Sequence, residues 1–448
     1  MMRRYPLKKI LGLTLLCVSW MTIAQANTIQ ETHFDNGTHL VVEEDHSAPV
    51  AMVQIWLKVG GRDEVPGKTG LAHVFEHMMF KGSDGLKPGQ YSKMIAAMGG
   101  RDNAFTSHDF TAYFETVPTA NVDQVLGMEA ERFAHLSLGK QEFSKEIRVI
   151  MEERRMRTDD DPNSHMFEEL SAAALRLHPY RNPVIGWMQD LQRLNIEDVR
   201  DFYKKHYVAR NVTVVVVGDV DFKHVKQIVR KTFGAMPNVQ VPPRFNPKEP
   251  EPLGAKRVNV HLPAKAPIVA ITLPVPVWEP GKNDQQAAAL AVATYILAGG
   301  RTALLQQRVV DDQRKAFSVD AGYDPFGMGL DLWYAYGMLG AKQSTDDFEH
   351  AVWGVIKDMG DKPVSERQLQ TAKRNMVASQ VFAQDSLYLR AKLIGRLETV
   401  GIGAKHMDDW IQAIQAVSAD DVQQVVKQFL RPERATTGVL IPTSKVKS

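Results

Sequence analysis

The feature that most restricts how this chain can fold is a sequence pattern that occurs twice. Residues 195–199 begin a predicted helix that leads to the apolar, strand-like residues 211–217, and residues 417–422 begin a predicted helix that leads to residues 435–439. The two passages lie about 220 residues apart and keep the same order of elements, which indicates a duplicated domain. Helices alternate with short strands in both halves, so we expect the α+β class, with two homologous domains.

A segment rich in proline separates the two predicted domains. Residues 237–252 contain six prolines together with several charged side chains, a composition typical of a semi-rigid linker. We therefore place a linker at 237–255, a first domain at 27–236 and a second domain at 256–448. A length of 448 residues is ample for two such domains.

The first 26 residues have the pattern of an export signal. Basic residues crowd the first nine positions, a mostly apolar run covers 10–23, and Ala24-Gln25-Ala26 offers the small residues of a cleavage site. The apolar run is shorter than a membrane span requires. We therefore predict a signal peptide at 1–26, cleaved near Ala26, and a periplasmic mature chain with no stable membrane span.

Charge and cysteine content exclude several functions for the mature chain. The net charge is only +2, and no basic stripe with interleaved aromatic residues is present, so no binding of nucleic acid is expected. Cys17 is the only cysteine, and it lies within the predicted signal. The mature chain therefore has no thiol for a disulfide, a nucleophile or a metal site, and any metal must be held by histidine and carboxylate.

Residues 73–77, His-Val-Phe-Glu-His, have the spacing of a catalytic zinc site. On a helix, His73 and His77 lie one turn apart on one face, so both imidazoles can reach one metal ion, and Glu76 lies beside them. The order His-x-x-Glu-His is the inverzincin signature. The alternative is that ordinary histidines form this pattern by chance, since the chain has 14 of them.

A third zinc ligand is expected from a glutamate-rich segment further along the chain, because a catalytic zinc needs three protein ligands. Glu146 and Glu153 lie on one face of a predicted helix, beside apolar side chains, where carboxylates need a compensating cation. We predict Glu153 as the ligand and Glu146 as the partner of a ligand histidine. The alternative is a solvated charged face. Glu152 lies near Arg148 and Arg155, so an ordinary surface ion pair explains it.

Longer stretches around these residues resemble one family of zinc peptidases. The pitrilysin, insulin-degrading enzyme and mitochondrial processing peptidase family is similar to this chain at residues 67–82, 99–106, 109–113, 178–180 and 217–219. The resemblance covers most of the chain after the predicted signal, and it points to the short, two-domain bacterial members of this inverzincin family.

The resemblance implies a chemistry for the chain. One Zn²⁺ per chain would be held by His73, His77 and Glu153, with Glu146 in support, in agreement with the argument from helical spacing. Glu76 would act as the general base on a zinc-bound water. The chain would thus be an exported zinc-dependent metalloendopeptidase that hydrolyses extended or unfolded peptides.

The segment Asn103-Ala104-Phe105 has the half-apolar composition of an edge strand. In the family this segment pairs with the substrate backbone, so extended peptides would bind by strand addition and folded proteins would mostly be excluded. The alternative for Phe105 is a core position in an interior strand.

The second half departs from the family pattern at two positions. Val310 stands where many relatives carry an arginine, and Phe317 stands where they carry a tyrosine that helps to bind substrate and stabilise the tetrahedral intermediate. Neither side chain can donate a hydrogen bond. The closed chamber of the family takes four domains and this chain has two, so the resemblance implies a dimer. We hypothesise that the partner is a zinc-motif-free relative that supplies the arginine and the tyrosine.

Relatives of this kind also include subunits without activity. A non-catalytic assembly subunit, or a peptide-binding subunit of a related complex, is therefore the alternative function. Non-catalytic relatives have usually lost the zinc motif. Here its residues are all present, which favours an enzyme: His73, Glu76, His77 and Glu153.

Overall fold

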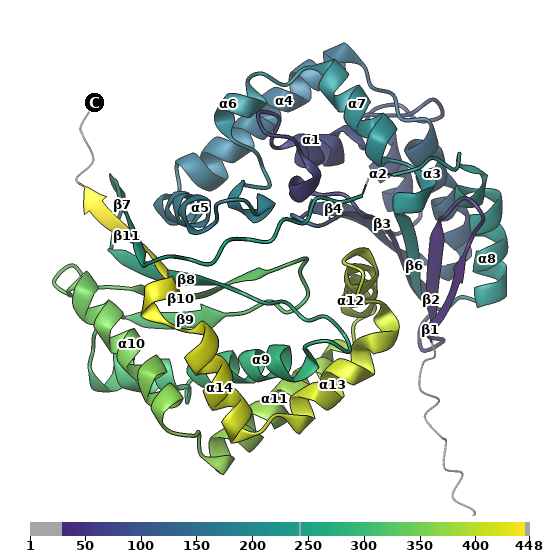
Figure 1. The fold of residues 1–448 in the computed structure, drawn as a ribbon. Helices are drawn as coiled ribbons and strands as arrows, with labels where there is room; N and C mark the ends of the chain where they lie inside the picture. Colours follow the sequence, from purple (N-terminus) through teal and green to yellow (C-terminus); the bar gives the residue numbers. More distant parts are fainter. Residues whose placement is uncertain (1–28, 242, 444–448) are drawn as a thin grey trace, which may run out of the picture.

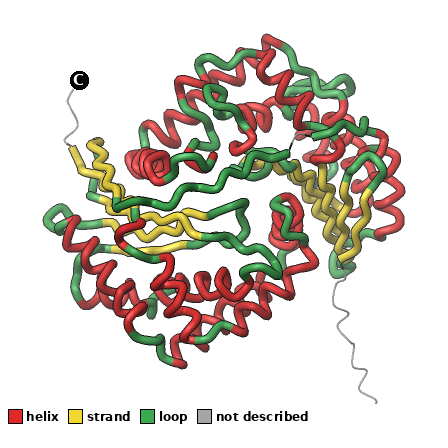
Figure 2. The backbone as a smooth tube through the Cα atoms, in the orientation of Figure 1, coloured by secondary structure: helices red, strands yellow, loops and turns green. Residues whose placement is uncertain are grey.

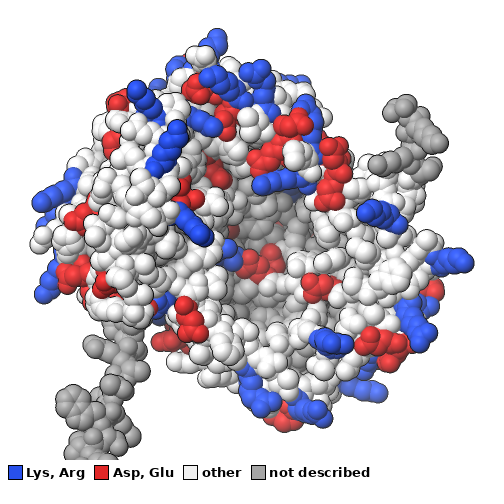
Figure 3. Space-filling view, turned by 180° about the vertical axis from the view of Figure 1, so that it is seen from behind, with Lys and Arg blue, Asp and Glu red and all other residues white. Residues whose placement is uncertain are grey.

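The computed structural model describes residues 29–241 and 243–443 (Figure 1). The predicted signal peptide at 1–26 lies outside the described residues. Two β-sheets lie toward the middle of the molecule, and helices gather on their outer sides (Figure 2). On the face opposite to that of Figure 1, the surface is hollowed near its centre, and acidic and basic side chains both border the hollow (Figure 3).

The first half contains a six-stranded sheet in the order β1-β2-β6-β3-β5-β4. Its strands are β1 (Ile29–His33), β2 (His39–Glu44), β3 (Val50–Leu57), β4 (Arg101–Thr106), β5 (Thr111–Pro118) and β6 (Val212–Gly218). β2 and β6 pair in parallel, and the other neighbours pair antiparallel. The valine-rich β6 is buried along its whole length, as expected for an interior strand covered on both faces.

The helices of the first half follow from amphipathic patterns whose apolar residues join one core with the inner strands. They are α1 (Leu71–Met78), α2 (Gln90–Ala97), α3 (Val122–Ala134), α4 (Lys140–Arg154), α5 (Pro162–Ala174), α6 (Met188–Leu191), α7 (Ile196–His206) and α8 (Phe222–Lys231). This core packs α1 against one face of the sheet, which matters because α1 carries the predicted zinc motif.

The second half contains a five-stranded sheet in the order β7-β11-β8-β10-β9. Its strands are β7 (Lys256–Pro263), β8 (Ile268–Val275), β9 (Ser318–Gly322), β10 (Asp331–Met338) and β11 (Thr436–Thr443). Its helices are α9 (Asp284–Ala298), α10 (Thr345–Asp361), α11 (Glu366–Ala383), α12 (Leu387–Thr399), α13 (Met407–Ala416) and α14 (Ala419–Phe429). β7 and β11 form the parallel pair here.

The two halves repeat one topology. α7 leads into β6, and α14 leads into β11. Both helices begin with a capping box, Asn195 with Asp198 in the first half and Ser418 with Asp421 in the second, so the repeated sequence pattern marks equivalent helix starts. The predicted α+β class with two homologous domains is confirmed.

Each half also places one helix on the sheet of the other half. α5 packs on β7, β11 and β8, where Met166 and Leu170 lie close to Gly438. α12 packs in turn on β3 and β6, where Gly395 lies against the buried Trp56. A glycine at each crossing lets helix and sheet approach closely, so the halves form one packed body.

The segment that the sequence assigns to a linker lies between the two sheets in the chain and has no helix or strand among its described residues. It is nevertheless bound to the first half. Arg244 pairs with Asp63 at 2.6 Å, and the carboxylate of Glu249 accepts hydrogen bonds from the backbone amides of residues 176–178. Across the described part of the chain, no helix has the length and apolarity needed to cross a membrane.

Candidate active site

α1 carries the His-Val-Phe-Glu-His motif and is fixed at both its start and its core face. Gly70 begins the helix with φ of 89°, and the carboxylate of Glu64 accepts hydrogen bonds from the amides of Gly70 and Ala72, which would otherwise lack partners. Val74 and Phe75 are fully buried in the core. The opposite face of α1 therefore presents the motif side chains toward α4.

α4 supplies the carboxylates that the sequence predicts. The Nε2 atom of His77 lies 3.4 Å from Oε2 of Glu153, and Nε2 of His73 lies 4.0 Å from Oε1 of the same carboxylate. Ligand atoms of all three side chains lie within 4.8 Å of one another. The structure thus brings together two histidines and a glutamate that are far apart in the sequence.

These three residues fit a zinc ion. Zn²⁺ with bonds of about 2.0–2.2 Å in a tetrahedron separates its ligand atoms by roughly 3.3 Å, close to the separation of His77 and Glu153. Burial lowers the pKa of His73 to about 3, so its imidazole is neutral and offers a lone pair. Two imidazoles and one carboxylate form the donor set of a catalytic zinc site, which leaves a position for water.

Glu146 holds the second ring nitrogen of His77. The Nδ1 atom of His77 lies 2.9 Å from Oε1 of Glu146, and Lys81 donates to Oε2 at 2.7 Å. Burial by itself would raise the pKa of Glu146, but the hydrogen bonds from His77 and Lys81 bring this pKa below its ordinary value. The carboxylate is therefore ionised and orients the ring. The role of Lys81 was not predicted from the sequence.

Glu76 lies beside the cluster of His73, His77 and Glu153, and its side chain is half-buried. Thr106, the last residue of β4, donates a hydrogen bond to Oε2 of Glu76 at 2.5 Å. Burial raises the pKa of Glu76 above its ordinary value, although Thr106 and His77 oppose this rise. A carboxylate with a raised pKa accepts protons more readily, as a general base must. The role of Thr106 was also not predicted, because no sequence pattern marks a threonine at the end of a strand as the partner of a catalytic carboxylate.

Glu153 has a further partner that the sequence did not reveal. Arg157 lies one turn beyond it and pairs with Oε1 at 2.7 Å, which leaves Oε2 toward His77. The chain between them passes from α4 into a π-helical turn at residues 155–159. Such turns often occur at functional sites, because they redirect side chains within a helix.

β4 is the edge strand of the first sheet and passes beside α1. The N–H of Ser107 donates to the carbonyl of Phe110 and closes the hairpin of β4 with β5. Hydrogen-bonded and non-hydrogen-bonded pairs alternate along an antiparallel ladder, so Ala104, three residues before Ser107, belongs to a non-hydrogen-bonded pair. Its N–H therefore points away from β5, to the open edge. The Asn103 side chain accepts from this N–H at 2.8 Å. Phe105 is half-buried against Trp56, so it is a packing residue within an edge strand.

The positions that depart from the family pattern lie in the second half. Val310 belongs to a π-helical segment at residues 306–312, and Phe317 precedes β9 with 70% of its surface exposed. Nearby Arg308 forms a surface ion pair with Asp358 at 2.7 Å. In the described chain, this stretch therefore offers no tyrosine hydroxyl. Of its two arginines, Arg308 is paired in this way, and Arg314 is exposed, with φ of 52°.

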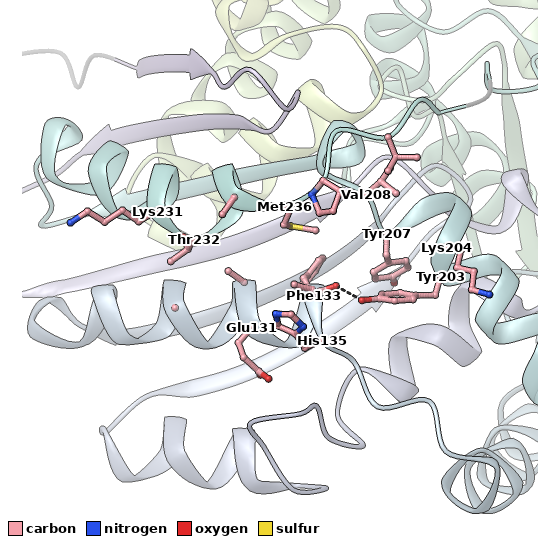
Figure 4. A pocket seen from close by; sticks show the side chains of 16 residues that line it. Glu131, Phe133, His135, Tyr203, Lys204, Tyr207, Val208, Lys231, Thr232 and Met236 are labelled. Carbon is pink, nitrogen blue, oxygen red and sulfur yellow. Dashed lines mark hydrogen bonds between the residues drawn. The ribbon is translucent and has the colours of Figure 1, made fainter.

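Two other features lie apart from the zinc motif. A surface pocket between α3, α7 and residues 231–239 is lined mainly by apolar groups, and the Tyr203 hydroxyl donates to the Phe133 carbonyl at its wall (Figure 4). At the contact of the two halves, His39 lies between Glu31 at 3.1 Å and Glu398 at 3.5 Å. Glu398 also accepts from a backbone amide, which gives this group a structural role.

Comparison with known proteins places the chain in a family. Residues 39–187 match the family model "Insulinase (Peptidase family M16)", and residues 193–376 match "Peptidase M16 inactive domain". The zinc protease PqqE of Helicobacter pylori is 34% identical over 325 residues, which cover 70% of this chain and 72% of that protein. An uncharacterized zinc protease of Streptomyces coelicolor is 26% identical and covers 92% of this chain and 90% of its own length.

Solved structures agree with this placement. The crystal structure of a protease from Helicobacter pylori has a TM-score of 0.86 and 28% identity, and covers 93% of this chain and 100% of that chain. The periplasmic protease PqqL from Escherichia coli shares the fold, with a TM-score of 0.77 and 18% identity over 93% of this chain and 48% of that one. The chain belongs to peptidase family M16, the pitrilysin family. Relatives named zinc proteases support a peptidase function.

Proposed function

We propose that this chain is an exported zinc metalloendopeptidase that hydrolyses extended or unfolded peptides. The observation that carries the proposal is the convergence of His73, His77 and Glu153 within 4.8 Å, with Glu76 on the same helix. The names of the relatives support a zinc peptidase. Export is supported by the pattern of residues 1–26 and by the likeness to a periplasmic protease.

In this proposal each side chain has one task. His73, His77 and Glu153 hold one zinc ion, and Glu146 keeps His77 in the orientation that faces it. The bound ion supplies Lewis-acid chemistry to a water molecule and to the scissile carbonyl. Glu76 takes the proton of the attacking water and passes it to the leaving amine.

The open edge of β4 is the proposed substrate site. Asn103, Ala104 and Phe105 lie on this edge strand, and Thr106 at its end binds Glu76. A peptide that adds as a further strand would replace the Asn103 side chain as the acceptor of the Ala104 N–H and would lie beside Glu76. Only an extended segment can pair in this way, because a folded substrate has no free strand to offer.

We further propose that the active assembly is a dimer. Val310 and Phe317 provide no hydrogen-bond donor where many relatives have an arginine and a tyrosine. A zinc-motif-free relative that supplies this pair would complete the site. If the purified zinc-loaded chain cleaves peptides at full rate as a homodimer, the proposal of a zinc-motif-free partner is wrong.

The decisive experiment replaces Glu76 with Gln, which keeps its size and removes the base. We expect turnover of an unstructured peptide to fall by roughly 100- to 10,000-fold, while zinc content is unchanged. Glu152→Gln is the matched control, because Glu152 is exposed and, among the residues that the structure describes, forms an ion pair with Arg155 alone. Equal cleavage by Glu76→Gln protein would overturn the proposal. Peptide binding without cleavage by the wild-type assembly would favour the alternative, a peptide-binding subunit.

A further inference from the structure

One flank of α12 borders the open edge of β4. α12 crosses the face of the first sheet that lies away from α1, and its Ala391 and Ile394 pack in that contact. Tyr388 and Lys392 lie one turn apart on the same flank. The Tyr388 ring lies 5.1 Å from that of Phe114 on β5, and Nζ of Lys392 lies 5.2 Å from the centre of the Phe105 ring on β4.

Lys392 differs from the other cations of this helix. Arg390 pairs with Glu43 at 2.8 Å, and Arg396 pairs with Asp324. Within the described chain, no carboxylate lies within 4 Å of Lys392, whose ammonium contacts the rings of Phe105 and Tyr388. Aromatic faces hold a cation in place but do not neutralise its charge. Lys392 therefore presents a positioned, uncompensated charge beside the strand edge.

The alternation of β4 decides which substrate side chains meet this charge. Thr106 bonds Glu76 and Ala104 packs in the core that contains α1, so these residues face α1. Asn103 and Phe105 therefore face α12. In a peptide paired with β4, the residue opposite Phe105 would point to the same face, with its Cβ about 5 Å from that of Phe105. A carboxylate at that position is within reach of Lys392.

We infer that Lys392 is a specificity-determining residue that selects peptides with an acidic side chain opposite Phe105. The inference rests on the proposed function and names its substrate class. Since Thr106, the next residue, binds Glu76, the selected position lies within about two residues of the cleaved bond. Arg101 is exposed on the same face of β4 and adds a second positive charge to that face.

The test uses one cleavable, unstructured peptide with glutamine at each of three positions on both sides of its cleaved bond. Each glutamine is replaced in turn by glutamate or lysine, and kcat/KM is measured with the zinc-loaded full chain and any subunit that co-purifies with it. We expect glutamate at one position to raise kcat/KM roughly three- to tenfold over glutamine. Lys392→Gln should abolish this preference, and Lys392→Glu should shift it to lysine.

Lys226→Gln is the matched control. Lys226 on α8 also lies over an aromatic ring, that of Phe222 at 5.7 Å, but α8 packs on β2, which is separated from β4 by three strands of the sheet. This variant should keep the glutamate preference. The inference is wrong if the wild-type assembly shows no glutamate preference, or if Lys392→Gln keeps it, and in both cases cleavage itself leaves the proposed function standing. If the zinc-loaded assembly cleaves none of the peptides, the proposed function fails and the inference falls with it.

Discussion

His77 presents its Nδ1 atom to the carboxylate of Glu146 at 2.9 Å, and this contact fixes which ring nitrogen faces Glu153. A carboxylate in this place keeps the imidazole in one tautomer and one orientation and makes it a stronger metal donor. Glu146 comes from α4 and His77 from α1, so the packing of these two helices, and not either sequence segment alone, sets the geometry of the cluster.

Replacing Glu146 with Ala should lower the affinity for zinc by about 10- to 100-fold, because His77 loses its orienting partner. Competition with a chelating dye measures this change. Glu142→Ala is the control, since Glu142 lies on the same helix and its one ion pair within the described part of the chain is with Lys145, on the surface. Equal zinc affinity for both variants would show that Glu146 does not support the ligand.

Thr106→Val should lower kcat by about tenfold and leave the zinc content unchanged. The variant keeps the shape of the side chain but removes the hydroxyl that donates to Glu76, so the carboxylate is no longer held in one position. Thr106→Ser restores the hydroxyl and should recover most of the rate. Full activity of Thr106→Val would mean that this hydrogen bond does not position Glu76.

Gly395→Ala should destabilise the protein by about 2–3 kcal/mol in the free energy of unfolding. A Cβ atom at this position would lie 2.1 Å from the ring of Trp56, which is fully buried between α12 and the first sheet. Urea unfolding followed by tryptophan fluorescence measures the change. Gly354→Ala in α10 has open space around its Cβ and should instead stabilise the protein by about 0.5–1 kcal/mol. A loss of similar size in both variants would contradict the role of the close contact.

Acid should weaken the protein through His178. Burial and the charge of Arg62 lower the pKa of His178 to about 4, while Asp109 and Glu249 oppose this shift. Three backbone amides hold the pKa of Glu249 below its ordinary value against the effect of burial. Both groups bind fewer protons in the folded state. The stability that His178 contributes is complete above pH 6.5 and is lost as the pH falls toward 4, whereas that of Glu249 is lost only below the ordinary pKa of a glutamate, about 4.5.

Urea unfolding at pH 7 and at pH 4.5 tests this dependence. Between pH 7 and pH 4.5, the free energy of unfolding of the wild type should fall by on the order of 2 kcal/mol more than that of His178→Gln, because glutamine has no titrating ring. Parallel pH profiles for the two proteins would show that His178 does not contribute to acid sensitivity.

Much of the site was predictable because helical spacing is a local property. His73, Glu76 and His77 share one helix, and Glu146 and Glu153 share another, so the face that each set occupies followed from the sequence. Thr106 and Lys392 were not predictable in this way. They come from β4 and α12, and nothing in either segment indicates which distant side chain it meets.

The sequence by itself determined the local order of the chain: the repeated α+β pattern, the inverted zinc motif and the face of α4 that carries its carboxylates, because each depends on residues within a few turns. Only the tertiary structure decided how these parts meet. Each half packs one helix, α5 or α12, on the sheet of the other half, and this depends on contacts between residues far apart in the sequence. Gly395 and Gly438 allow this close packing because they have no side chain at the contact. That packing places Lys392 beside the open edge of β4, where we expect its positive charge to contact a bound substrate.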